Sequence, residues 1–312
     1  MDSELPLLLA LLAICVALVA HLASQNPERW WSRGEWERLT RLRGDDPVQI
    51  HWRAVGQLGL GRPEEAIAEV RKLQSRGAAP VLYLNSMVEA QVTAGRYREA
   101  VALSRTQDFS ADSWLPPERV LVLINVAEAL YNLGRWEEAQ ELLAPLDAAA
   151  EGDPLVRSAL ALQRAWIHGG RGEVPQARAQ LESVVRADLP RSYWPEYHFA
   201  RAFSALVAGD FPAAEAELDT AQALALRAST RRNLLFLRGR VRFAQGDLEG
   251  AQRLLAEGAA HPFRSQGADG LLLWGEVLAR LGRGEEARAA WALATARDPQ
   301  SAQAAVAAAR LA

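Results

Sequence analysis

Cysteine is almost absent from this chain of 312 residues, because Cys15 is the only one and lies in an apolar segment near the N-terminus. A single cysteine excludes disulfides within the chain, thiolate zinc sites and a catalytic thiol in the rest of the protein. The five histidines are isolated, and no His/Glu pair has the spacing of metal ligands. We therefore expect no metal site and no cofactor.

Motifs of catalysis are also lacking. The sequence has no Gly-x-Gly-x-x-Gly or Walker-type phosphate loop and no Gly-x-Ser-x-Gly nucleophile elbow. Paired glutamates such as Glu137-Glu138 recur at one place, the first turn of a predicted helix. Acidic side chains there complement the helix dipole, so the pairs have a structural explanation. The sequence predicts no enzyme and no catalytic residue.

Lysine is nearly missing as well, with Lys72 the only one, and the formal net charge is −3. No strongly basic domain is present, so we expect no nucleic-acid partner. The densest group of arginines lies between Arg227 and Arg242. Helical spacing spreads these side chains around a cylinder, which favours solvated positions over a phosphate-binding patch.

Residues that favour β-strands are scarce, because only five isoleucines and six threonines occur, while alanine and leucine are abundant. A hexamer of the form Gly-x-x-x-x-Ala recurs seven times, with successive glycines 34 to 39 residues apart. These glycines are Gly61, Gly95, Gly134, Gly172, Gly209, Gly246 and Gly282. Each stands between two helical patterns, where a left-handed glycine ends the first helix. A period of this length predicts stacked helical hairpins.

The third copy shows the pattern best, with small residues Ala127 and Ala139 around Gly134 and an aromatic at Trp136. These spacings resemble the tetratricopeptide repeat family, whose unit is a helix–turn–helix. The resemblance covers roughly residues 47 to 300 and implies an all-α solenoid of about seven repeats. We expect a curved rod, with the seven repeats in residues 47–298 and a capping helix in residues 299–312.

An apolar segment near the N-terminus predicts a membrane anchor. Residues 1–4 form an acidic tail, and residues 5–24 hold a stretch from Leu5 to Ala23 whose only polar side chain is His21. As a helix, this stretch is about 28 Å long, close to the hydrocarbon thickness of a bilayer. The acidic tail argues against the alternative, a cleaved signal peptide.

The charges that flank this segment predict its orientation. No basic residue precedes it, whereas several arginines follow it closely. The positive-inside rule then places the N-terminus outside and the repeats in the cytoplasm, at a bacterial inner membrane. In the juxtamembrane segment, residues 25–46, we expect Trp30, Trp31, Arg33 and Trp36 to lie at the membrane interface. The alternative is that these tryptophans pack as a half-repeat beneath the first full repeat.

In the family, defined positions of each first helix point into a concave groove that binds a protein or peptide. The resemblance assigns to this groove Asn85, Glu89, Glu128, Tyr131, Asn132, Trp166, Phe203 and Arg240. Asn125 is added because it lies one residue from a groove position. The groove is thus expected to be polar in its N-terminal half and aromatic in its C-terminal half. For the phenylalanines Phe199, Phe203, Phe236 and Phe243, burial in the core is the competing interpretation.

Together these features predict a membrane-anchored scaffold or adaptor that binds a protein partner and recruits it to the bacterial inner membrane. Its layout is similar to that of the lipopolysaccharide-assembly protein B family, without the Cys-x-x-Cys metal-binding domain at the C-terminus. Two alternatives stay open: an exported envelope or pilus assembly factor, and a constitutive accessory subunit of a larger membrane complex.

Overall fold

The structure is a computed structural model that describes residues 26–77, 83–106, 116–189 and 191–312. The predicted membrane anchor, residues 5–24, and the tail before it lie outside the described residues. Within the described ranges, no helix combines the length and the apolar character that a bilayer crossing requires.

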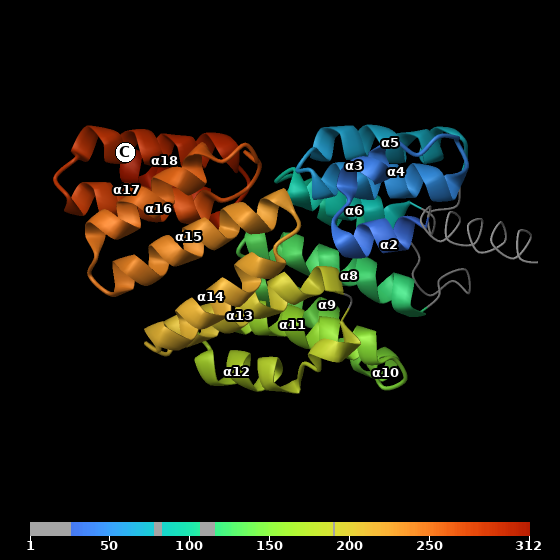
Figure 1. Ribbon diagram of the computed structural model, residues 1–312, viewed down its shortest axis with the longest axis horizontal. Helices are drawn as coiled ribbons and strands as arrows, with labels where there is room; N and C mark the ends of the chain where they lie inside the picture. Colours follow the sequence, from blue (N-terminus) through green and yellow to red (C-terminus); the bar gives the residue numbers. More distant parts are fainter. Residues whose placement is uncertain (1–25, 78–82, 107–115, 190) are drawn as a thin grey trace, which may run out of the picture.

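The described part of the chain consists of helices joined by turns and short loops, and it contains no strand (Figure 1). Seven helix pairs follow one another: α4 (Pro47–Gly59) with α5 (Pro63–Ser75), α6 (Leu84–Thr93) with α7 (Tyr97–Arg105), α8 (Pro116–Asn132) with α9 (Trp136–Leu143), α11 (Pro154–Gly170) with α12 (Val174–Ser183), α13 (Trp194–Val207) with α14 (Phe211–Leu224), α15 (Ala228–Ala244) with α16 (Leu248–Ala260), and α17 (Ala268–Arg280) with α18 (Gly284–Arg297). The terminal helix α19 is Ala302–Leu311. The predicted all-α, tetratricopeptide-like solenoid is confirmed.

Short elements join some of these pairs. They are η2 (Ala144–Leu146), α10 (Asp147–Ala150), η3 (Arg186–Asp188) and η4 (Arg191–Tyr193).

The repeated glycine makes each turn between paired helices. All seven turn glycines have φ between 73° and 82°, the left-handed region that other residues enter only at a cost. At Gly134, the amide donates a hydrogen bond to the Tyr131 carbonyl at 2.9 Å, and the next amide, of Arg135, donates to Leu130 at 2.9 Å. These bonds satisfy carbonyls at the end of α8 while the chain reverses into α9.

Small residues allow the paired helices to approach. Ala127 and Ala139, on the two helices of the third repeat, are fully buried. In the last repeat the corresponding residue of the first helix is Gly275, where an added Cβ would stand 2.2 Å from Trp291 Nε1. A larger side chain at such a position would push the pair apart.

Ahead of the first repeat, α2 (Pro27–Arg33) and α3 (Trp36–Thr40) pack against α4. Trp30 and Trp36 are buried, in a cluster with Leu39 and Val55. Their rings therefore contact protein, as in the half-repeat alternative, and not a membrane surface. Trp31 is partly exposed and the Arg33 side chain is 53% exposed. The prediction of a membrane interface therefore stands only for these two residues.

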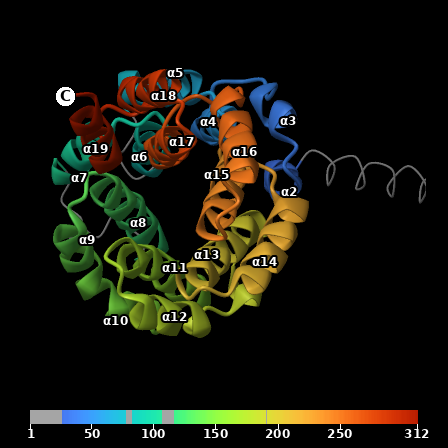
Figure 2. The same ribbon diagram turned by 90° about the vertical axis from the view of Figure 1, so that its left-hand side faces the viewer.

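The stack winds into a superhelix, and its last repeats return to lie beside its first (Figure 2). The expected curved rod had no such contact between its first and last repeats. Hydrogen bonds join residues 202 and 174 positions apart: the Arg98 amide donates to Gln300 Oε1 at 2.8 Å, and Gln266 Nε2 donates to the Val92 carbonyl at 2.5 Å. We call this the inter-turn interface. It joins Gly34–Trp36, Gly61, residues 92–99 and Gly134 to Leu226–Ala228, Phe263–Gln266 and Asp298–Ala302.

Candidate functional site: the inner face of the superhelix

The first helices of the repeats form the inner face of the superhelix. Figure 2 shows α6, α8, α11 and α13 on the inside and α9, α12 and α14 on the outside. This arrangement follows from the sequence, because the glycine turn sends each second helix back along the outer side of its partner. Side chains from helices far apart in sequence therefore meet in the interior.

Four of the predicted groove residues come together on α6 and α8. Asn125 Nδ2 donates a hydrogen bond to Asn85 Oδ1 at 2.9 Å. Glu89 and Glu128 lie one turn further along the same helices, near enough for the charge of Glu89 to raise the pKa of Glu128. All four are partly exposed, as expected for a polar surface that retains contact with solvent.

Glu89 makes an ion pair with Arg227, which precedes α15. The Arg227 Nη1 to Glu89 Oε1 distance is 2.8 Å, with 27% of the arginine side chain and 23% of the glutamate exposed. Burial alone would lower the pKa of Arg227, but the carboxylates of Glu89 and Glu196 outweigh it and hold that pKa above its ordinary value. The expectation that Arg227 belongs to a solvated patch was wrong.

Arg232 departs from the solvated patch too, because it is only 2% exposed. Its guanidinium donates to the carbonyls of Ser265 and Gln266. Burial lowers the pKa of Arg232 to about 10, so the residue keeps its charge at neutral pH. It supports the loop that carries Gln266 into the inter-turn interface.

Glu128 and one further glutamate, Glu196, face the same interior region with raised pKa values. Burial, followed by the charge of Glu89, raises the pKa of Glu128 to about 7. Burial also raises the pKa of Glu196 on α13. Thr230 Oγ1 donates to Glu196 Oε1 at 2.9 Å, whereas Glu196 Oε2 is buried with no hydrogen-bond donor among the described residues. The interior thus holds more carboxylates than its cation balances.

The aromatic half of the predicted groove is divided between surface and core. The Trp166 ring lies 5.3 Å from Phe199 and 5.7 Å from Phe203 between centroids, and all three are partly exposed. Phe236 instead is buried, packed between Gly258 and Gly270. The core interpretation is therefore correct for Phe236, whereas Phe199 and Phe203 are only partly buried and pack against the edge of a core cluster.

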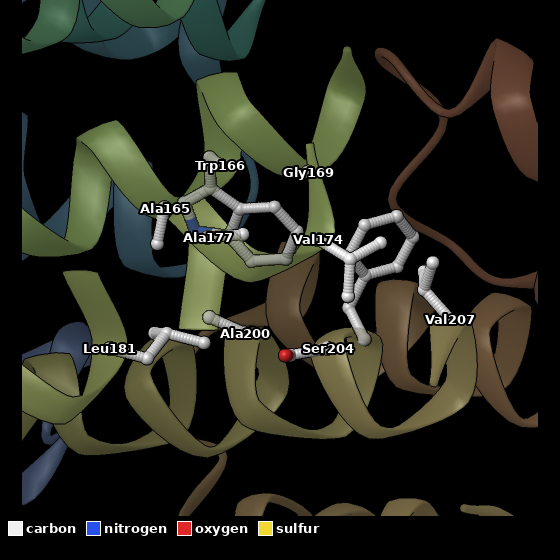
Figure 3. Close-up of a pocket in the computed structure, with 10 residues that line it drawn as sticks. Ala165, Trp166, Gly169, Val174, Ala177, Leu181, Ala200, Ser204 and Val207 are labelled. Carbon is white, nitrogen blue, oxygen red and sulfur yellow. The ribbon is translucent and has the colours of Figure 1, made fainter. Parts of the chain in front are cut away.

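A small apolar hollow lies next to Trp166, between α11, α12 and α13. Figure 3 shows Trp166, Val174, Ala200 and Val207 around it, with Ser204 as the polar group. Its free volume is about 10 Å³, roughly the space of one water molecule. It is too small to hold a partner side chain without movement.

The remaining predicted residues lie in different surroundings. Tyr131 packs on Gly170, and burial, followed by the charge of Asp269, raises its pKa to about 12. Arg240 Nη2 lies 3.6 Å from Asp269 Oδ2. The side-chain amide of Asn132 donates to the Glu128 carbonyl at 2.9 Å within the same helix. It therefore satisfies a backbone carbonyl in the last turn of α8. Within the described ranges, no group of three or more His, Cys, Asp or Glu side chains is arranged to hold a metal ion.

Comparisons with known proteins agree with this architecture. Family models described as tetratricopeptide repeat match residues 116–162 and residues 158–183, 195–220 and 233–257. These matches support the tetratricopeptide repeat family for this chain. No curated protein matches the sequence.

The solved structures with TM-scores above 0.5 share the fold at low identity. A tetratricopeptide repeat protein from Parabacteroides merdae is 14% identical with a TM-score of 0.53, covering 86% of this chain and 98% of that chain. The Cut9–Hcn1 hetero-tetramer of APC/C gives 14% identity and a TM-score of 0.57, covering 85% of this chain and 49% of that chain. PilW, a type IV pilus biogenesis factor, is 17% identical with a TM-score of 0.46 and covers 72% of this chain and 97% of that chain.

Proposed function

We propose that this protein is a non-catalytic scaffold that binds a protein partner on the inner face of its superhelix and recruits it to the bacterial inner membrane. The observation that carries the proposal is the polar inner face, where Asn85, Glu89, Asn125 and Glu128 converge from two repeats and stay partly exposed. Buried structural cores do not need such a set. Protein partners are what tetratricopeptide proteins bind.

The membrane part of the proposal comes from the sequence. The apolar stretch Leu5–Ala23 has the length of a bilayer span, and arginines follow it. The repeats would then lie in the cytoplasm. A fusion of the C-terminus to a phosphatase that is active only in the periplasm tests this topology. Phosphatase activity would show that the repeats are exported, which is the alternative of an envelope or pilus assembly factor.

Affinity capture with the full chain, read by mass spectrometry, tests partner binding. The quadruple variant Asn85→Ala, Glu89→Ala, Asn125→Ala and Glu128→Ala is expected to lose the captured partner while circular dichroism shows unchanged helicity. Unchanged capture would overturn the inner-face proposal. A matched variant on the outside, with alanine at the exposed Glu249, Arg253, Glu257 and Glu285, should keep the partner.

The sizing of the captured complex separates a scaffold from a constitutive subunit. After extraction in mild detergent, a scaffold is expected to elute mostly without its partner, because reversible recruitment lets the complex dissociate on dilution. A constitutive subunit of a larger membrane complex would instead co-purify in fixed stoichiometry.

A further inference from the structure

Three carboxylates from three separate repeats face the same interior region. Glu89 lies on α6, Glu128 on α8 and Glu196 on α13, and Arg227 at the start of α15 lies within electrostatic range of all three. Helices that are remote in the chain therefore contribute to one anionic site. Among the described residues, the guanidinium at this site is that of Arg227, which donates to Glu89.

The other two carboxyl groups lack a cation of their own. No described residue donates a hydrogen bond to the Glu128 carboxylate, and Glu196 Oε2 is a buried atom with no donor. A buried acceptor that is left without a donor is costly, so Glu196 Oε2 would gain from a donor that the described residues do not supply. His51, the other basic group near Glu89, adds no charge, because burial lowers its pKa.

Arg227 shows how a cation can fit this region. Its guanidinium reaches Glu89 from the opposite side of the interior, across 138 positions of sequence. Its Nε atom is buried and bonds to no described residue. The ion pair with Glu89 therefore leaves one donor of the guanidinium unsatisfied. A second cationic group entering the interior would find the Glu128 carboxylate and Glu196 Oε2 without a donor among the described residues, and would compete with Arg227 for Glu89.

We infer that the inner face binds a basic side chain of the partner, an arginine or a lysine, among Glu89, Glu128 and Glu196. The inference rests on the proposed scaffold function and names the chemistry of its partner. The partner segment is thus cationic where it enters the superhelix, and Arg227 occupies part of its site when the partner is absent.

The test measures binding of a fluorescein-labelled oligo-arginine peptide by anisotropy at physiological ionic strength, with oligo-lysine and oligo-glutamate peptides of equal length as comparisons. The variant Glu89→Gln, Glu128→Gln, Glu196→Gln is expected to weaken oligo-arginine binding by about tenfold or more, as expected for lost charge-assisted hydrogen bonds. Oligo-glutamate should not bind.

A matched control separates a specific site from general attraction to an acidic protein. Glu249→Gln, Glu257→Gln, Glu285→Gln removes the same charge from exposed positions on α16 and α18. It is expected to change the affinity by less than about twofold, because exposed charges are screened by salt. Equal losses in the two triple variants would overturn the inference.

Single variants keep the test decisive if the triple variant unfolds. Glu128→Gln removes no hydrogen bond, so it should fold and still weaken oligo-arginine binding severalfold. Unchanged affinity in this variant would overturn the inference. Arg227→Gln is expected to strengthen binding, because the internal competitor is gone, and weaker binding would contradict the role given to Arg227.

Failure of this inference and failure of the proposed function are distinguishable. If the natural partner is lost from the alanine variant of the inner face but retained by Glu128→Gln and by the triple glutamine variant, the scaffold function stands and the cationic partner is rejected. If no inner-face variant affects capture, the proposed function itself fails.

Discussion

The Tyr97 hydroxyl donates a hydrogen bond to Asp298 Oδ2 at 3.2 Å, although the two residues are 201 positions apart. Both side chains are buried. Tyr97 begins α7 in the second repeat, and Asp298 follows α18 in the seventh. The bond therefore lies in the inter-turn interface, where the superhelix comes round on itself. Neighbouring contacts are polar too, including Gln300 Nε2 to Glu99 Oε2 at 2.9 Å.

Removing this hydroxyl should weaken the inter-turn interface. We expect Tyr97→Phe to cost about 1–3 kcal/mol, because Asp298 Oδ2 loses its donor in a buried place. Chemical denaturation measures the loss, and small-angle scattering should show a larger radius of gyration. Tyr83→Phe is the control, since no hydrogen bond to the Tyr83 hydroxyl is present among the described residues, and it should change neither quantity. An unchanged radius in Tyr97→Phe would show that the interface does not depend on this bond.

The pKa of Glu128 predicts a pH dependence. Its value of about 7 lies above the ordinary 4.5, so the contribution of the neutral carboxyl to stability is complete below about pH 4.5 and is lost as the pH rises through 7. We expect Glu128→Gln to match the wild type at pH 4.5 and to melt higher at pH 8, by on the order of 2 °C. Melting curves across this range test it. Glu249→Gln, at an exposed site, should show no such crossover. A difference at pH 8 equal to that at pH 4.5 would contradict the raised pKa of Glu128.

A comparison of two turn glycines distinguishes the cost of backbone strain from the cost of a steric clash across the inter-turn interface. Gly61 and Gly172 have φ of 74° and 75°, so alanine should cost about 1–2 kcal/mol at each. At Gly61 the added Cβ would also stand 2.7 Å from Phe263 Cδ2, whereas at Gly172 it meets nothing. Thermal unfolding should therefore show Gly61→Ala to be the less stable variant. Equal melting temperatures would argue that Phe263 does not pack there.

Alanine is expected to change the stability in opposite directions at two helical glycines, Gly275 and Gly284. Gly275→Ala places a Cβ 2.2 Å from Trp291 Nε1, and overpacking of this kind costs about 1–3 kcal/mol. Gly284 begins α18 with open space around it, so Gly284→Ala should stabilise the protein by up to about 1 kcal/mol. Denaturant midpoints measure both changes. A stabilising Gly275→Ala would show that the last pair is less tightly packed.

The repeat unit was predictable because local chemistry determines it. Gly134 must be glycine for its left-handed turn, and Ala127 must be small for helix contact, so the period is visible in sequence. The inter-turn interface was not predictable, since its position depends on small rotations added over seven repeats. Tyr97 and Asp298 carry no motif that pairs them.

The candidate site was predictable in part. Asn85, Glu89, Asn125 and Glu128 were assigned by their place in the repeat, and the structure brings them together. Their role in binding stays a prediction. Arg227 was missed because it precedes its helix, and its contact with Glu89 depends on the winding of the whole stack. Glu196 and Thr230 were missed too, although they lie within α13 and α15 only 34 positions apart, because no sequence motif pairs them.

Trp36 Nε1 donates to the Leu226 carbonyl at 3.0 Å, so even the segment ahead of the first repeat is matched to a loop far along the chain. In an open array, duplication or deletion of one unit leaves every neighbour contact intact. Here the same event would displace Leu226, Gln266 and Asp298 from the residues they meet. The copy number of this array is thus constrained by its own geometry, and lineages that gain or lose a hairpin must abandon the closure or rebuild it.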